Sequence, residues 1–229
     1  MSRIDPPFRA DHVGSLLRPR GLLDARQRYQ QNSISKEQLR QVEDQHIRAV
    51  VQKQEAIGLR SITDGEFRRT FFHVDFLQRL QGVTVSGGIE AKFRSEHGEV
   101  NFAPPRLSVA GRLRHVEDIQ KADFEFLRSV TSQTPKVTIP SPTMVHFRGG
   151  RKAIDIDAYL CDPKLRAGVK ERGDDPNRLS RAYAALINSV IDGRPDELTV
   201  AVHLCREISA APGSLRAVTS RSPKCSSTS

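Results

Sequence analysis

Aromatic side chains are scarce in this sequence, which has no tryptophan, three tyrosines and ten phenylalanines in 229 residues. Stacking on aromatic rings is a main source of affinity for single-stranded nucleic acids, so the composition offers little for such binding. The chain is nevertheless basic, with 36 Lys and Arg against 27 Asp and Glu and a formal net charge of +9. The basic residues alternate with acidic ones, as in 40–44, a pattern typical of a solvated helix face. We expect no nucleic-acid partner; the alternative, a basic nucleic-acid-binding protein, predicts binding that weakens steeply with salt.

Cysteine is also rare, and long apolar runs are missing. The three cysteines, Cys161, Cys205 and Cys225, form an odd and widely spaced set, which argues against a disulfide framework and favours a reducing compartment. No apolar run approaches the roughly 18 residues that a membrane-spanning helix needs, and residues 1–6 do not resemble the start of a secretory signal. The sequence therefore predicts a cytoplasmic protein with no membrane partner.

The regular patterns of the chain predict alternating helices and strands. Ser35 and Gln38 stand at capping-box spacing at the start of a helix over 35–57, and Gly58 is a typical helix stop. A short strand over 59–63 follows and ends in polar residues. Further predicted elements are helices at 22–31, 71–80, 118–130, 163–171 and 177–191, strands at 107–111, 137–139 and 198–203, and an inserted polar hairpin at 83–103 with Gly87-Gly88 as its turn. This alternation predicts an α/β fold of the (β/α)8 barrel type, although the predicted strands are too few to close a barrel of eight.

The end of the sequence differs in composition from the rest. Residues 208–229 contain seven serines and no aromatic residue, and they show no periodicity. Such a segment cannot bury enough apolar area to order itself. We therefore predict a partial barrel domain over 1–206 and a disordered tail over 207–229.

His203 and Cys205 stand at the end of the predicted strand 198–203. Alternate side chains of a strand point to the same face, so an imidazole and a thiol would lie side by side and form half of a zinc site. Zinc needs at least one more protein ligand, and Glu207 and Cys225 are the nearby candidates. The same pattern is also typical of simple packing, because cysteine behaves as a small buried hydrophobe.

Three other polar segments also stand at predicted strand ends. They are His12–Ser15, Asp64–Glu66 and Ser141–Thr143. The carboxyl ends of barrel strands converge at one rim, so these segments and 203–205 would form a single site. Each segment alone also has a structural interpretation, as a capped turn, a turn and a rigid proline loop respectively.

Five segments occur in an order that resembles the single-domain relatives of cobalamin-independent methionine synthase. They are 9–19 (RADHVGSLLRP), 62–69 (ITDGEFRR), 140–142 (PSP), 158–166 (AYLCDPKLR) and 203–206 (HLCR). The resemblance covers about Phe8 to Arg206. It implies a (β/α)8 barrel that binds zinc and transfers a methyl group from 5-methyltetrahydrofolate, as its polyglutamate, to homocysteine, giving methionine. Zinc would favour the thiolate form of homocysteine, which is the nucleophile.

The resemblance also implies roles for individual residues. Val13, Gly14 and Ser15 match the strand end that binds homocysteine in the family. Glu66 matches the carboxylate that holds the amine of the amino acid, a role that suits a carboxylate facing an ammonium group.

For the metal, the resemblance implies that His203 and Cys205 are the first two zinc ligands. Cys161 lies in a matching segment but is not a zinc ligand in the family, and neither Glu207 nor Cys225 matches a family position. The proton-donating histidine of the family has no counterpart in this chain, so the catalytic residue is left unassigned.

The sequence departs from the family pattern in two places. Between Ile154 and Ala158, family members carry a longer segment that includes an acidic substrate-binding motif, and after Arg206 the resemblance stops. These departures indicate an internal deletion and a frameshift or early stop. They support a second interpretation, a non-catalytic truncated remnant of the family without bound zinc. A different alkyl transfer to a thiol is a further alternative within the superfamily, and the sequence leaves the oligomeric state open.

Overall fold

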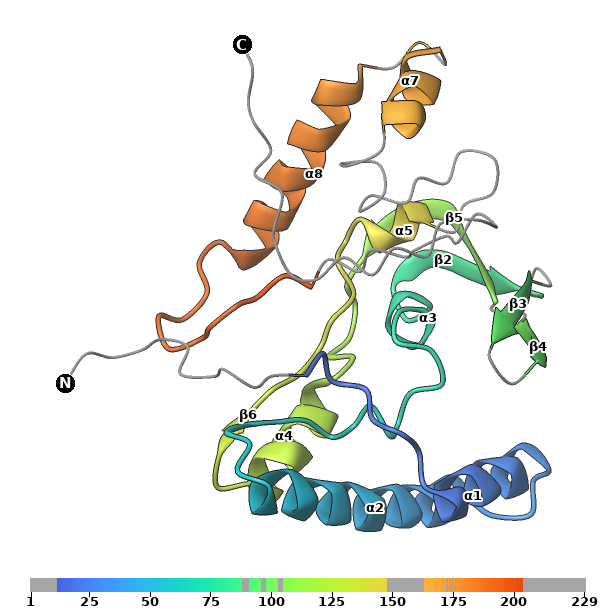
Figure 1. Cartoon of the computed structure of the whole chain (residues 1–229), viewed down its shortest axis with the longest axis vertical. Helices are drawn as coiled ribbons and strands as arrows, with labels where there is room; N and C mark the ends of the chain where they lie inside the picture. Colours follow the sequence, from blue (N-terminus) through green and yellow to red (C-terminus); the bar gives the residue numbers. More distant parts are fainter. Residues whose placement is uncertain are drawn as a thin grey trace.

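The computed structural model describes residues 12–87, 91–95, 98–102, 105–147, 163–171, 173 and 175–203. The protein is a mixture of helices and short strands (Figure 1). In chain order the elements are α1 (Arg20–Gln30), α2 (Lys36–Ala56), β1 (Ser61–Ile62), α3 (Val74–Leu77), β2 (Gln81–Ser86), β3 (Ala91–Ser95), β4 (Gly98–Phe102), β5 (Arg106–Arg114), α4 (Lys121–Val130), β6 (Thr134–Pro135), α5 (Met144–Phe147), α7 (Pro163–Glu171) and α8 (Pro176–Ile191).

Helices α1 and α2 lie side by side and confirm the first two predicted helices (Figure 1). The capping box of α2 is present, because Gln38 N donates to Ser35 Oγ over 3.2 Å and Ser35 N donates to Gln38 Oε1 over 2.8 Å. At the other end Gly58 has φ +85°, a left-handed conformation that favours glycine and ends the helix. Local side-chain chemistry therefore sets both ends of the longest helix.

The core of this part surrounds a short parallel strand pair. Strands β1 and β6 pair with Ser61 opposite Thr134 and Ile62 opposite Pro135, and α2 and α4 pack against them. The side chains that fill the core come from α1, α2 and α4, from β1 and from the turn after β1: Leu22, Ile47, Val51, Ile62, Phe67 and Leu127. The described residues form a mixture of helices and strands, which confirms the α/β class in its coarse form. Their parallel sheet is limited to this one pair of strands.

The second strand of the pair begins earlier than the sequence predicts. The prediction placed it at 137–139, whereas β6 is Thr134–Pro135. Lys136 N donates to Ile62 O over 2.7 Å, and beyond this bond the chain leaves β1. Val137 and Ile139 are exposed and lie outside β6. These two apolar residues therefore do not belong to a strand of the sheet.

The remaining described strands pair antiparallel. The predicted strand at 107–111 lies in β5 and pairs with β2, and β3 pairs with β4. The predicted hairpin over 83–103 is therefore wrong in its pairing: Gly87 follows β2 on the way to a different ladder and is not a hairpin turn. Val74, Leu77 and Leu107 form a second apolar cluster that joins α3 to β5.

The predicted helix 71–80 is confirmed only over α3. The Asp75 carboxylate accepts hydrogen bonds from Thr70 N over 3.1 Å and Phe71 N over 2.7 Å. Bonds of this kind from a side chain to the backbone compete with helix formation. They hold the chain before Val74 in a non-helical turn.

The C-terminal helices agree with the sequence, but the strand predicted after them does not form. Helices α7 and α8 match the predicted 163–171 and 177–191, and Asp175 caps α8 by accepting from Asn177 N over 2.9 Å. Residues 198–203 have no strand pairing, and Val200 and Val202 are exposed. No described strand lies alongside to supply their backbone hydrogen bonds. The predicted tail 207–229 and the segment 154–162 lie outside the described residues, among which no helix is both long and apolar enough to cross a membrane.

Candidate functional site

Three segments that are far apart in the sequence meet at the carboxyl end of the β1–β6 pair. Thr63, which follows β1, donates its hydroxyl to Gly14 O over 2.8 Å, and Leu16 N donates to Gly65 O over 3.0 Å. These bonds fasten the loop 12–16 to the turn 64–66. Thr138, beyond the end of β6, reaches the same place from the other strand. Parallel strands bring polar residues together at this edge, and we call Gly14, Glu66, Arg69 and Thr138 the edge cluster.

Glu66 is held in an uncommon backbone conformation, with φ +58° directly after Gly65 at +67°. Its N–H donates to Asp64 Oδ1 over 2.9 Å, and its carbonyl accepts from Arg18 Nη2 over 3.3 Å. A non-glycine residue with positive φ carries a conformational cost and occurs where surrounding contacts impose it. The turn thereby sends the carboxylate of Glu66, a residue that is only 4% exposed, into the edge cluster.

One oxygen of the Glu66 carboxylate is fully engaged. Thr138 Oγ1 donates to Glu66 Oε1 over 2.7 Å, and Arg69 Nη2 lies 3.4 Å from the same oxygen. The other oxygen, Oε2, makes no hydrogen bond with any described residue and is not among the fully buried atoms that lack a partner. A carboxylate oxygen in this situation is available to a ligand that donates hydrogen bonds.

Arg69 holds Thr138 more tightly than it holds Glu66. Its Nη2 donates to Thr138 Oγ1 over 2.8 Å, and its Nη1 donates to Thr138 O over 3.0 Å. The Arg69 carbonyl accepts from Arg18 Nη2 over 2.7 Å and from Arg26 Nη1 over 3.1 Å. Burial lowers the pKa of the Arg26 guanidinium, and the nearby charge of Arg18 acts in the same direction. The base of the edge cluster is therefore cationic and firmly bonded.

Gly14 closes the cluster on the side of the loop 12–16. A Cβ atom at this position would lie 2.8 Å from Thr138 Cγ2 and 3.2 Å from Glu66 Oε1. Real Cβ atoms do not approach so closely, and φ of +152° further favours glycine. The close approach of the loop to the carboxylate thus depends on the missing side chain.

Asp64 supports the turn from a partly buried position. Burial raises the pKa of its carboxyl group, while the hydrogen bond from Glu66 N and the charge of Arg69 act in the opposite direction. Its role within the described structure is to hold the Glu66 backbone, since Oδ1 is the acceptor for Glu66 N.

The structure brings together two of the four segments that the sequence placed at one rim. Gly14 is buried beside Glu66, and Val13 and Ser15 are exposed on either side of Gly14. From the third segment, Ser141 Oγ and Thr143 Oγ1 bond to each other over 2.9 Å; Thr138, before this segment, reaches the cluster instead.

The zinc ligands implied by the family resemblance are not assembled in the described part of the chain. His203 is exposed and is the last described residue of the segment that follows α8, and Cys205 lies outside the described residues. Across the ranges that the structure describes, no group of three or more His, Cys, Asp or Glu side chains could hold a metal ion.

Sequence reasoning missed the two residues that contact the Glu66 carboxylate, Thr138 and Arg69. Arg69 stands in the segment 62–69 that carries the family resemblance, so a search for a cation near Glu66 would have found it. Thr138 gives a weaker signal, because its position depends on where β6 ends.

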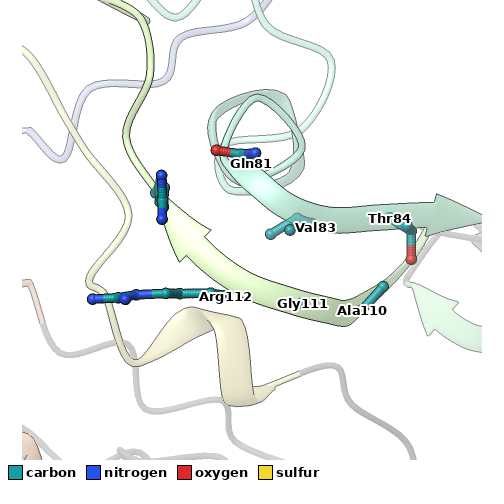
Figure 2. A pocket seen from close by; sticks show the side chains of 8 residues that line it. Gln81, Val83, Thr84, Ala110, Gly111 and Arg112 are labelled. Carbon is teal, nitrogen blue, oxygen red and sulfur yellow. The ribbon is translucent and has the colours of Figure 1, made fainter.

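The hollow at the β2–β5 ladder is unrelated to the edge cluster. It lies where the register shifts between Gln81 and Val83, and Figure 2 shows these β2 residues across from Ala110, Gly111 and Arg112 of β5. Its ionisable lining residues are Arg112 and Arg114. Its lining contains no carboxylate, histidine or cysteine, and we assign it no function.

Comparisons with known proteins identify relatives of this chain. No family model matches the chain. The Bacillus subtilis protein YxjH, which is uncharacterized, is 36% identical over 87% of this chain and 62% of its own length. The crystal structure of a candidate vitamin-B12-independent methionine synthase from Listeria monocytogenes has a TM-score of 0.62 and 32% identity, over 87% of this chain and 66% of that one. The 5-methyltetrahydropteroyltriglutamate–homocysteine methyltransferase of Thermotoga maritima is 24% identical over 61% of this chain and 18% of its own length.

The fold and the edge cluster define an α/β protein with a polar site at the carboxyl edge of a parallel strand pair. The chain belongs to the family of cobalamin-independent methionine synthase-like proteins. It spans less than two thirds of the length of the first curated relatives that it matches, 62% of YxjH and 64% of the related Bacillus subtilis protein YxjG.

Proposed function

We propose that the edge cluster binds homocysteine, and that Glu66 holds the ammonium group of this amino acid. The observation that carries the proposal is the state of the Glu66 carboxylate, in which Oε1 is bonded to Thr138 and Oε2 is free of described partners. A hydrogen bond between an ammonium group and a carboxylate is charge-assisted and about twice as strong as a neutral one. The placement of this carboxylate also agrees with the role that the family resemblance implies.

Val13, Gly14 and Ser15 would form the adjoining wall of the site. Gly14 lets the loop pass directly beside the carboxylate, and the exposed Val13 and Ser15 would contact the rest of the ligand. In this arrangement the turn 64–66 selects the amine, and the loop 12–16 contacts the remaining groups.

The reaction proposed for the whole protein is methyl transfer from 5-methyltetrahydrofolate, as its polyglutamate, to the homocysteine thiol, giving methionine. The Thermotoga maritima relative carries this reaction in its name. We further propose a (β/α)8 barrel architecture that the domain 1–206 completes only in part, with 207–229 as a separate tail.

His203 and Cys205 are the two residues that we propose as zinc ligands. The described residues do not fit a complete zinc site, because they contain no group of three suitable side chains. We therefore derive no step of the reaction through the metal.

A second candidate function is homocysteine binding without methyl transfer, as expected of a non-catalytic remnant. It shares the edge cluster with the first candidate and differs from it in having no bound zinc. The two candidates make the same prediction for binding and opposite predictions for turnover.

Calorimetric titration of the full chain with homocysteine tests the shared part of the proposal. Hydrogen bonds to charged groups contribute about 1.5–3 kcal/mol, so Glu66→Gln should weaken binding by roughly 10- to 150-fold. Glu117→Gln is the matched control, because Glu117 is surface-exposed and pairs with Arg79; it should leave binding unchanged. Equal binding by wild type and Glu66→Gln would refute the assignment of Glu66.

Elemental analysis and a methyl-transfer assay separate the two candidates. About one zinc per chain, lost in Cys205→Ser and accompanied by methionine formation, supports the methyltransferase. Homocysteine binding with neither zinc nor turnover supports the non-catalytic alternative.

A further inference from the structure

We infer that Thr138 and Arg69 are positioning residues that turn the Glu66 carboxylate so that Oε2 alone faces the ammonium group of the ligand. The inference rests on the proposed function and extends it to two residues to which no role has so far been assigned. It concerns how the site distinguishes an amino acid from an analogue that lacks the amine.

The three side chains form a directed chain of hydrogen bonds. Arg69 Nη2 donates to Thr138 Oγ1 over 2.8 Å, and this hydroxyl donates its own proton to Glu66 Oε1 over 2.7 Å. A hydroxyl has a single proton to donate. Because the guanidinium can only donate, the hydroxyl proton must go to the carboxylate, and the direction of the chain is fixed.

The arrangement anchors one carboxylate oxygen and leaves the other without a hydrogen bond from a described residue. Arg69 Nη2 is closer to Thr138 Oγ1, at 2.8 Å, than to Glu66 Oε1, at 3.4 Å. Its second nitrogen is occupied by the carbonyl of Thr138 at 3.0 Å. Arg69 therefore binds Glu66 mainly through the threonine hydroxyl and forms no two-pronged pair with the carboxylate, which would have engaged both oxygens.

The carboxylate cannot easily turn away from this orientation. The positive φ of Glu66 sets the direction of its Cα–Cβ bond, and Gly14 packs against Oε1. The hydrogen bond from Thr138 Oγ1 then holds Oε1 on the side of Thr138 and leaves Oε2 facing the ligand. Without this hydroxyl, Oε1 would turn toward Arg69 directly, and both oxygens would share the guanidinium.

Thr138→Val tests the inference, because it removes the hydroxyl and keeps the β-branched shape. Titration of the full-length variant with homocysteine should show binding weakened about tenfold. The analogue 4-mercaptobutyrate lacks the amine and should bind the variant and wild type with equal affinity. Thr138→Ser should restore homocysteine binding. The matched control is Thr131→Val. Thr131 Oγ1 also donates to a glutamate, with a distance of 2.6 Å to Glu55 Oε1, but this pair lies outside the edge cluster. The control should change the affinity for neither homocysteine nor 4-mercaptobutyrate.

The outcomes separate a positioning role from a purely structural one. Equal weakening of both ligands by Thr138→Val, or weakening of neither, overturns the inference. Failure of wild type to bind homocysteine refutes the proposed function instead. The inference is then tested by a double-mutant cycle of unfolding with Thr138→Val and Glu66→Ala: a double variant less destabilised than the sum of the single variants supports the hydrogen bond, and strict additivity overturns it.

Discussion

Gly14 and Thr138 approach so closely that a methyl group on Gly14 would lie 2.8 Å from Thr138 Cγ2. The contact joins the loop 12–16 to the segment after β6, with Glu66 between them. Gly14→Ala should therefore destabilise the protein by about 1–3 kcal/mol, the range for overpacking of a well-packed site, and should also displace the Glu66 carboxylate. Urea unfolding measures the first effect and homocysteine titration the second.

Gly111→Ala is the control for this substitution. Gly111 lies in β5, and a Cβ atom there would meet nothing within 4 Å. Its substitution should leave homocysteine binding unaffected. If Gly14→Ala matched this control in both stability and binding, the close approach of Gly14 would have no functional weight.

The stability of the fold should also depend on Arg68. Its side chain is only 4% exposed and lies 3.2 Å from Glu43, 2.6 Å from Asp44 and 3.2 Å from Asp123. The guanidinium also stacks on the Phe126 ring, 4.9 Å from its centroid. Arg68→Met should cost about 3 kcal/mol of unfolding free energy, because it leaves the buried Glu43 carboxylate without its ion-pair partner.

An exposed ion pair provides the comparison for Arg68. Arg20 pairs with Asp24 over 3.7 Å, and its side chain is 91% exposed. Arg20→Met should change stability by less than about 1 kcal/mol. Similar losses for Arg20→Met and Arg68→Met in urea unfolding would contradict the importance of burial.

Buried acids should make the stability of the protein depend on pH. Burial is the main cause that raises the pKa of Asp64 and that of Glu43. Between the ordinary carboxylate pKa and the raised one, the folded state binds more protons than the unfolded state, so stability falls as pH rises through this window. Each such proton contributes at most about 1.4 kcal/mol per pH unit.

Asp64→Asn should flatten part of this slope, since an amide does not titrate and can still accept the hydrogen bond from Glu66 N. Urea unfolding of wild type and variant at several pH values from mildly acidic to neutral gives the comparison. The exposed Asp24→Asn should keep the wild-type slope. A difference between Asp64→Asn and wild type that does not change with pH would contradict the raised pKa.

The capping box of α2 should make a measurable contribution to stability. Ser35 Oγ accepts the bond from Gln38 N, and loss of such a cap typically costs about 1 kcal/mol. Ser35→Ala should show this loss by thermal or urea unfolding. Ser33→Ala, in the turn before the cap, should be close to neutral; equal effects of the two substitutions would show that the side-chain cap contributes nothing.

The sequence predicted the helices better than the strands, and the physical reason is the range of the interactions. Helix α2 is delimited by Ser35 and Gly58, whose effects act within a few residues. The position of β6 depends on bonds to β1, such as Lys136 N to Ile62 O, which no local pattern encodes. For the same reason the sequence pattern of 137–139 and 198–203 predicted strands that the structure does not contain at these positions.

The candidate site was predictable in part. Gly14 and Glu66 were identified through the family resemblance, and the structure places them together. Thr138 was missed because its role depends on the end of β6, and Arg69 because an arginine after a turn is usually solvated. The predicted roles of His203 and Cys205 stay predictions.

The hydrogen bond between Thr138 and Glu66 spans 72 residues of sequence, whereas α1 and α2 are joined by a short turn. Local contacts form early in folding, and contacts between distant segments form late because closing a long loop is slow. Refolding chains should therefore gain helical signal before they gain affinity for homocysteine. In a stopped-flow refolding experiment, ligand capture would mark the moment when the β1–β6 pair closes.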